Sequence, residues 1–159
     1  MPLFLLCAAC AAAQQPDGRL RAAVRRPGVD SARFEAVATA RRCGAGHGVV
    51  LEAVQRGNAL LVWLRFPDSL TAGSYSLLTR GDTAARRGAV TAVRWMQGEA
   101  AHGLVLDSGA VTVTREAGHL TVRAQGSGLE YAGARRASVD AVFEQMTLAA
   151  ETTACGAAR

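Results

Sequence analysis

Apolar and polar residues alternate along most of this chain, with short turn sequences between the alternating runs. The clearest case is the stretch 109–126, where Val111 and Val113 alternate with threonines and a second alternating run starts at Leu120. Successive side chains of a strand point to opposite faces, so this period predicts strands with one buried face. A turn over 116–119 joins the two runs, which predicts a β-hairpin. Its solvent side is expected to carry Thr112, Thr114, Thr121 and Arg123.

Similar short segments, bounded by turn residues, continue from residue 31 to the end of the chain. This spacing predicts an all-β domain, an antiparallel sandwich or barrel of about 8–10 short strands. Residues 32–42 and 140–150 contain enough alanine for a helix, but the alternation favours strands there. The expected strands, beside the hairpin, are 33–40, 49–55, 59–66, 73–78, 88–96, 103–106, 129–131 and 138–148.

The run from Leu60 to Leu64 is apolar at every position. Such a run indicates a central strand covered on both faces, or one whose outer face meets a ligand or a membrane. It is expected to form a hairpin with the preceding strand, through a turn in which Gly57 and Asn58 take positive φ.

The size of the chain, 159 residues of which 50% are hydrophobic, suits one domain with a substantial core. Aromatic residues make up only 5% of the chain, so valine, leucine and alanine must fill most of this core. The aromatic side chains expected inside are Trp63, Trp95, Phe34, Phe66, Phe143, Tyr75 and Tyr131.

All 18 basic side chains are arginines, and the net charge is +5. Nucleic-acid binding requires clustered positive charge, whereas these arginines occur as separated pairs with acidic residues between them. We therefore expect no nucleic-acid partner and only weak, salt-sensitive attraction to anionic surfaces.

Residues 1–13 form an uncharged apolar run that ends in alanines, as in the hydrophobic part of an export signal. The run is shorter than the ~20 apolar residues that span a bilayer. Two outcomes stay open: cleavage after Ala13, or lipidation at Cys10 as in bacterial lipoproteins, although Cys7 stands where leucine is usual. Both predict an exported protein, whether periplasmic, secreted or lipid-anchored in the envelope. A flexible tether is expected over 14–30, before a single β domain over 31–159.

Cys43 and Cys155 remain in the folded part of the chain. An even pair in an exported protein predicts a disulfide, which would tie the tail to the first strand. The alternatives are two free buried thiols or a metal site with Cys43 and His47, for which no further ligand pair is evident.

The run GLVLDSGAVTVTREAGHLTVRAQGSGLEY resembles the C-terminal strands of small secreted or lipid-anchored bacterial β-sandwich proteins of uncharacterised function. The resemblance covers roughly residues 103–148, and Gly128-Leu129 stands where that family places an aromatic residue. It implies an envelope location and a β-sandwich, and it brings no catalytic residue.

No catalytic or cofactor motif is evident, and the glycine-rich stretch 44–48 leads into a strand rather than into the helix of a phosphate loop. We therefore expect a non-enzymatic envelope module that binds a protein, a glycan or an apolar ligand, without a cofactor. The alternatives are a calycin-like barrel around an apolar small molecule, or a metal-binding protein or enzyme that uses His47, His102 and His119. The acidic residues expected on outward-facing positions are Glu52, Glu99, Asp107, Glu116, Glu130 and Asp140.

Overall fold

The computed structural model describes residues 18–155 apart from 45–47, 80, 83 and 134. Every regular element in these residues is a strand, and no helix long and apolar enough to cross a membrane occurs among them. The all-β prediction is confirmed. The strands are β1 (Gly18–Arg26), β2 (Val29–Cys43), β3 (Gly48–Gln55), β4 (Asn58–Arg65), β5 (Gly73–Ser76), β6 (Gly88–Gln97), β7 (Ala100–Val105), β8 (Ser108–Glu116), β9 (His119–Leu129), β10 (Arg136–Met146) and β11 (Leu148–Thr153).

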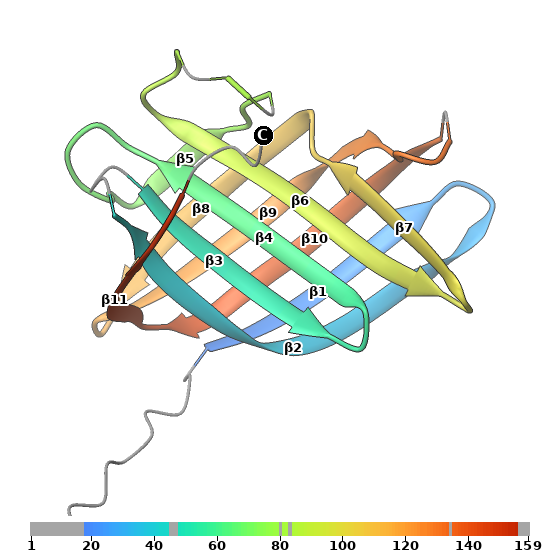
Figure 1. Cartoon of the computed structure of the whole chain (residues 1–159), viewed down its shortest axis with the longest axis horizontal. Coiled ribbons are helices and arrows are strands. Elements are labelled where there is room, and N and C mark those ends of the chain that lie inside the picture. The colour runs from blue at the N-terminus through green and yellow to red at the C-terminus, as the bar shows by residue number, and fades with distance from the viewer. Residues whose placement is uncertain (1–17, 45–47, 80, 83, 134, 156–159) are drawn as a thin grey trace, which may run out of the picture.

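One sheet contains all of these strands, in the order β5-β8-β9-β10-β1-β2-β3-β4-β6-β7, with β11 beside β2. The named pairs are antiparallel except for the parallel pair of β11 and β2. The sheet is strongly curled, so that β3, β4 and β6 cross in front of β8, β9 and β10 in Figure 1. Its concave face therefore encloses the core.

Short backbone contacts join each end of the curled sheet to another strand. Leu104 of the edge strand β7 forms an antiparallel bridge with Glu130, and the Tyr131 N–H donates to the Gly103 carbonyl at 2.9 Å. After the opposite edge strand β5, the Leu78 N–H donates to the Ala89 carbonyl of β6 at 2.8 Å. These contacts satisfy backbone groups that an open edge would expose.

Alternation within the strands explains how the core is filled. One set of alternate side chains on each long strand is buried, and many of them are alanines, which let the two halves of the sheet approach closely. The prediction that Tyr131 lies in the core is wrong, because it is 65% exposed, and Trp63 is only half-buried on the outer face. The aromatic residues that do lie inside are Phe34, Phe66, Tyr75, Trp95 and Phe143.

Strand β1 corrects the prediction of a tether over 14–30. From Gly18 to Arg26 the chain pairs with both β10 and β2, at the middle of the sheet. Leu20, Ala22 and Val24 are buried, and their neighbours are arginines and an alanine, so the period of two is present in the sequence. Pro27 and Gly28, interpreted as tether residues, lie between the paired ends of β1 and β2. The paired sheet therefore includes the chain from Gly18 onward.

The hairpins show which residues accept positive φ. Ala117 (φ 48°) and Gly118 (φ 84°) form the two-residue turn between β8 and β9, which confirms the predicted hairpin and its turn. Between β3 and β4 the positive values belong to Arg56 (φ 48°) and Gly57 (φ 81°). Asn58, which was expected to take positive φ, instead accepts the Met96 N–H on its side-chain oxygen at 2.9 Å.

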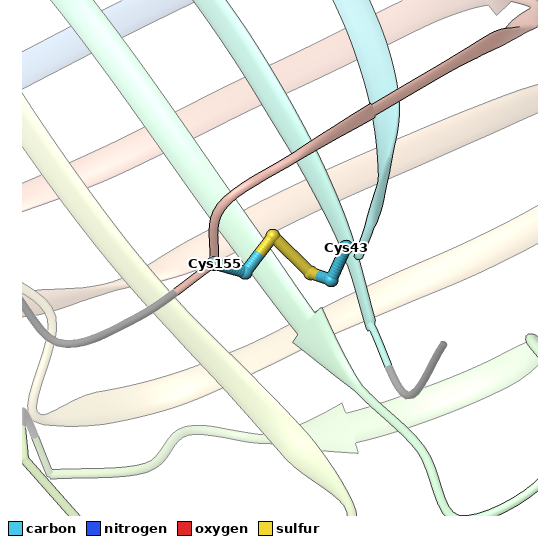
Figure 2. Close-up of a disulfide and its surroundings, with 2 residues drawn as sticks. All are labelled: Cys43 and Cys155. Atoms are coloured by element: carbon cyan, nitrogen blue, oxygen red, sulfur yellow. A yellow bond between two sulfur atoms is a disulfide. The ribbon is translucent and has the colours of Figure 1, made fainter. Parts of the chain in front are cut away.

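Strand β11 places the end of the chain beside the end of β2. A register shift after Phe143, with Gln145 at φ 55°, turns the chain past the start of β1, where a side chain at Gly18 would collide with Met146. The Sγ atoms of Cys43 and Cys155 lie 2.12 Å apart, the separation of a disulfide bond, as Figure 2 shows. The predicted pairing is thus confirmed at the level of distance.

Replacing Cys43 and Cys155 with serine together is expected to lower the free energy of unfolding by about 4 kcal/mol, because the bridge closes a loop of 112 residues in the unfolded chain. Denaturant titration of the oxidised protein and of the double variant measures this difference. Equal unfolding midpoints, with both cysteines of the parent titrating as free thiols, would contradict a stabilising disulfide.

Candidate functional site

The inner face of the sheet carries one buried ionic cluster, made of Arg26, Trp95, His102 and Glu130, which we call the Glu130 cluster. Glu130 Oε2 lies 3.2 Å from His102 Nδ1 and 3.6 Å from Arg26 Nη1. The Arg26 and Glu130 side chains are only 9% and 6% exposed. The His102 ring stacks on buried Trp95 with centroids 5.4 Å apart, and the Arg26 guanidinium lies 5.9 Å from the Trp95 ring centroid. The cluster therefore joins β1, β6, β7 and the segment after β9.

Burial of Glu130 corrects the prediction that it faces outward. It follows the last residue of β9 and bridges Leu104, and the alternation there directs Glu130 inward and Tyr131 outward. Its Oε1 atom is buried without a hydrogen-bond partner among the described residues, which is costly for a carboxylate. Removing the carboxylate would nevertheless leave Arg26 without its partner in a poorly solvated place.

The three histidines are not brought together as far as the structure describes them. His102 lies beside Glu130, whereas His119 is at the opposite end of β9, where its Nδ1 is 3.3 Å from the Thr147 hydroxyl. The length of β9 separates them by a distance on the order of 30 Å, from the usual rise per residue of a strand. His47 lies outside the described residues. Within the described part of the chain, no three histidine, cysteine or acidic side chains are grouped as a metal site would require.

A shallow hollow on the outer face of β4, β6 and β7 is the second candidate, and we call it the Tyr131 hollow. Its volume is about 410 Å³. Most of its floor consists of small residues at outward positions of adjacent strands, so the surface there is nearly flat. The hollow is lined by Ala59, Leu61, Ala92, Val93, Arg94, Ala101, His102, Gly103, Leu104, Tyr131 and Ala132.

Tyr131 forms one wall of this hollow. Its N–H donates to the Gly103 carbonyl, and a methyl group added at Gly103 would lie 3.4 Å from the Tyr131 ring. Glycine at this position therefore lets the ring pack directly against β7. The ring stays 65% exposed, which is a large exposed fraction for an aromatic side chain held by its backbone.

The loop that follows Tyr131 is held by an ion pair. Arg136 donates hydrogen bonds to both carboxylate oxygens of Asp107, at 2.5 and 3.0 Å, and to the Ser127 hydroxyl at 2.9 Å. These hydrogen bonds lower the pKa of the Asp107 carboxyl below its usual range. The Asp107 N–H also donates to the Ser127 carbonyl at 3.0 Å, so the connection after β7 is fixed to the end of β9.

A larger outer hollow, of about 550 Å³, lies over β9, β10, β1 and β2 and has a different character. Two of its cations are neutralised: Arg123 pairs with Asp140 at 2.8 Å, and Arg21 pairs with Glu144. Its lining thus combines these paired charges with Arg33, which has no ion pair among the described residues, and with apolar residues such as Ala23 and Val142.

Comparison with known proteins found no family model, no curated protein and no solved structure that matches this chain. The expected resemblance to small envelope β-sandwich proteins therefore stays a prediction. The candidate sites rest on the geometry of this chain alone.

Replacing Glu130 with alanine is expected to lower the free energy of unfolding by about 3 kcal/mol, because it leaves Arg26 unpaired in a buried position. The matched control is Glu52→Ala, which breaks the half-exposed pair of Arg41 and Glu52 and should cost less, about 1 kcal/mol. Denaturant titration measures both. Equal losses in the two variants would show that the Glu130 cluster does not stabilise the fold.

The Arg136→Gln variant is expected to return the Asp107 pKa toward its ordinary range, since the hydrogen bonds from Arg136 are the main cause of its lowering. Because the folded-state pKa is lowered, Asp107 stabilises the fold above its unfolded-state pKa, and this contribution is lost as the pH falls through the folded-state value. Carbon NMR titration of the Asp107 carboxyl measures the shift. An unchanged titration in the variant would contradict this cause.

Proposed function

We propose that this chain is a non-enzymatic, exported binding module, and that the Tyr131 hollow receives an apolar group of its ligand. The observation that carries the proposal is the exposed Tyr131 beside a floor made largely of alanine and glycine residues. Hydrophobic and aromatic side chains line most ligand-binding sites, and the volume falls within the range of about 300–1,000 Å³ of such sites.

The composition of the floor supports this proposal. Outward positions of a solvent-facing sheet usually carry polar or charged side chains, as β9 and β10 do here with Arg123 and Asp140. In the Tyr131 hollow the corresponding positions are alanine, leucine and glycine. A ligand that covers them would remove apolar surface from water.

The packing of the interior favours an outer site over the calycin-like alternative. Large side chains from strands across the sheet, such as Leu20, Leu51 and Phe143, are fully buried within one continuous core. A sheet packed in this manner supports a filled sandwich rather than a barrel around an internal ligand.

Two further parts of the proposal are that the chain is not an enzyme and that it is exported. Of the residue types that form covalent intermediates, the lining of the Tyr131 hollow contains His102, whose Nδ1 lies 3.2 Å from Glu130 Oε2, and Tyr131 itself, but no serine, cysteine or carboxylate. The disulfide distance of Cys43 and Cys155 is compatible with an oxidising compartment, and hence with export. The choice between lipidation at Cys10 and cleavage after Ala13 concerns residues outside those described.

An Ala92→Leu variant tests the site, because the new side chain would rise from the floor of the hollow at a half-buried, outward position. NMR titration of the full chain with 2-naphthamide, a planar neutral probe, is expected to show binding that weakens at least about tenfold in the variant. The control is Ala110→Leu, the same change on the outer face of β8. Equal affinity in both variants, or no binding of either 2-naphthamide or its carboxylate analogue 2-naphthoate by the parent, would contradict the proposal.

A further inference from the structure

We infer that the ligand of the Tyr131 hollow is a planar aromatic carboxylate, whose anionic group pairs with Arg94. The inference rests on the proposed function, since it assigns a ligand class to the same hollow. Three observations support it: Arg94 lies at the edge of the hollow, its guanidinium has no carboxylate partner among the described residues, and the floor of the hollow is flat and apolar.

Arg94 lies at the edge of the apolar floor. On β6 it follows Ala92 at the next outward position, and in the register of the sheet it stands between Ala59 of β4 and Gly103 of β7. Both of these neighbours are small, so no bulky side chain on either adjacent strand separates the arginine from the hollow. Its aliphatic stem can lie along the floor while the guanidinium stays in water.

The guanidinium of Arg94 has no hydrogen-bond or ion-pair partner among the residues that the structure describes. In the hollow over β9, β10, β1 and β2, Arg21 and Arg123 are both paired with carboxylates, although Arg33 there has no ion pair among the described residues. An unpaired guanidinium presents two parallel N–H groups in the geometry that a carboxylate accepts. A cationic ligand would be repelled, and a neutral ligand would leave this donor pair unused.

The shape of the hollow selects a flat apolar body. The floor spans neighbouring strands at Ala59, Ala92 and Gly103, none of which projects beyond a methyl group. Tyr131 offers an exposed ring at one side, and aromatic rings attract one another in offset or edge-to-face arrangements. A ring lying on the floor can therefore contact Tyr131 while its carboxylate reaches Arg94.

The decisive experiment compares 2-naphthoate with its neutral isostere 2-naphthamide by NMR titration of the full chain at low salt. The naphthoate is expected to bind about tenfold more tightly than the amide. In Arg94→Gln this difference should disappear through a loss of naphthoate affinity alone. The control Arg19→Gln makes the same charge change at an exposed residue of β1 and should preserve the difference.

The outcomes distinguish a failure of the Arg94 pairing from a failure of the proposed function. Equal affinities for the two probes in the parent, or an unchanged preference in Arg94→Gln, would overturn the pairing with Arg94 while the hollow remained a binding site. Absence of binding by both probes would overturn the proposed function itself. The saturated analogue decahydronaphthalene-2-carboxylate tests planarity: it should bind several-fold more weakly than naphthoate, and equal binding would overturn the preference for an aromatic body.

Discussion

The pairing of Leu104 with Glu130 is the contact on which both candidate sites depend. It attaches the edge strand β7 to the segment after β9 and so joins two parts of the sheet that are far apart in strand order. Because neighbouring residues of an extended segment point to opposite faces, the same pairing directs Glu130 into the core and Tyr131 to the outside. The buried cluster and the outer hollow are therefore the two faces of one junction, and the Asp107–Arg136 pair fixes the connections on either side of it.

A comparable constraint acts at the other end of the molecule. The register shift near Gln145 carries the chain past the start of β1, so that β11 extends the sheet beside β2 and brings Cys155 to Cys43. A methyl group at Gly48 would lie 2.7 Å from the Cys43 sulfur and 2.9 Å from Trp63 Nε1, so a larger residue there would have to displace these two side chains. Trp63 lies on the outer face because the alternation along β4 directs Val62 and Leu64 inward.

Much of the fold could be predicted from alternation, because each strand of a curled sheet has one buried face. The hairpin of β8 and β9, the central position of β4 and the pairing of Cys43 with Cys155 all followed from local pattern or cysteine count. The Glu130 cluster and the Tyr131 hollow could not be predicted from alternation. Glu130 and Tyr131 lie in a segment too short to show its own period, and their orientation is set by Leu104, which is distant in sequence. In the sequence, Arg94 resembles the other arginines, and only the strand register shows that it lies between Ala59 and Gly103. The one sequence signal for the Tyr131 hollow was the presence of small residues at outward positions of the strands.

The two hollows on the outer face of the sheet differ in their lining residues, and this difference favours the Tyr131 hollow as the ligand site. Over β9, β10, β1 and β2, Arg21 and Arg123 are paired with carboxylates, whereas the Tyr131 hollow combines an apolar floor with Arg94, which has no ion pair among the described residues. The most direct test is to map amide chemical-shift changes along the whole chain as 2-naphthoate is added. Binding in the Tyr131 hollow predicts changes concentrated at Ala59, Ala92, Arg94, Gly103 and Tyr131. Changes concentrated instead over β9, β10 and β1, or spread evenly over the surface, would contradict it.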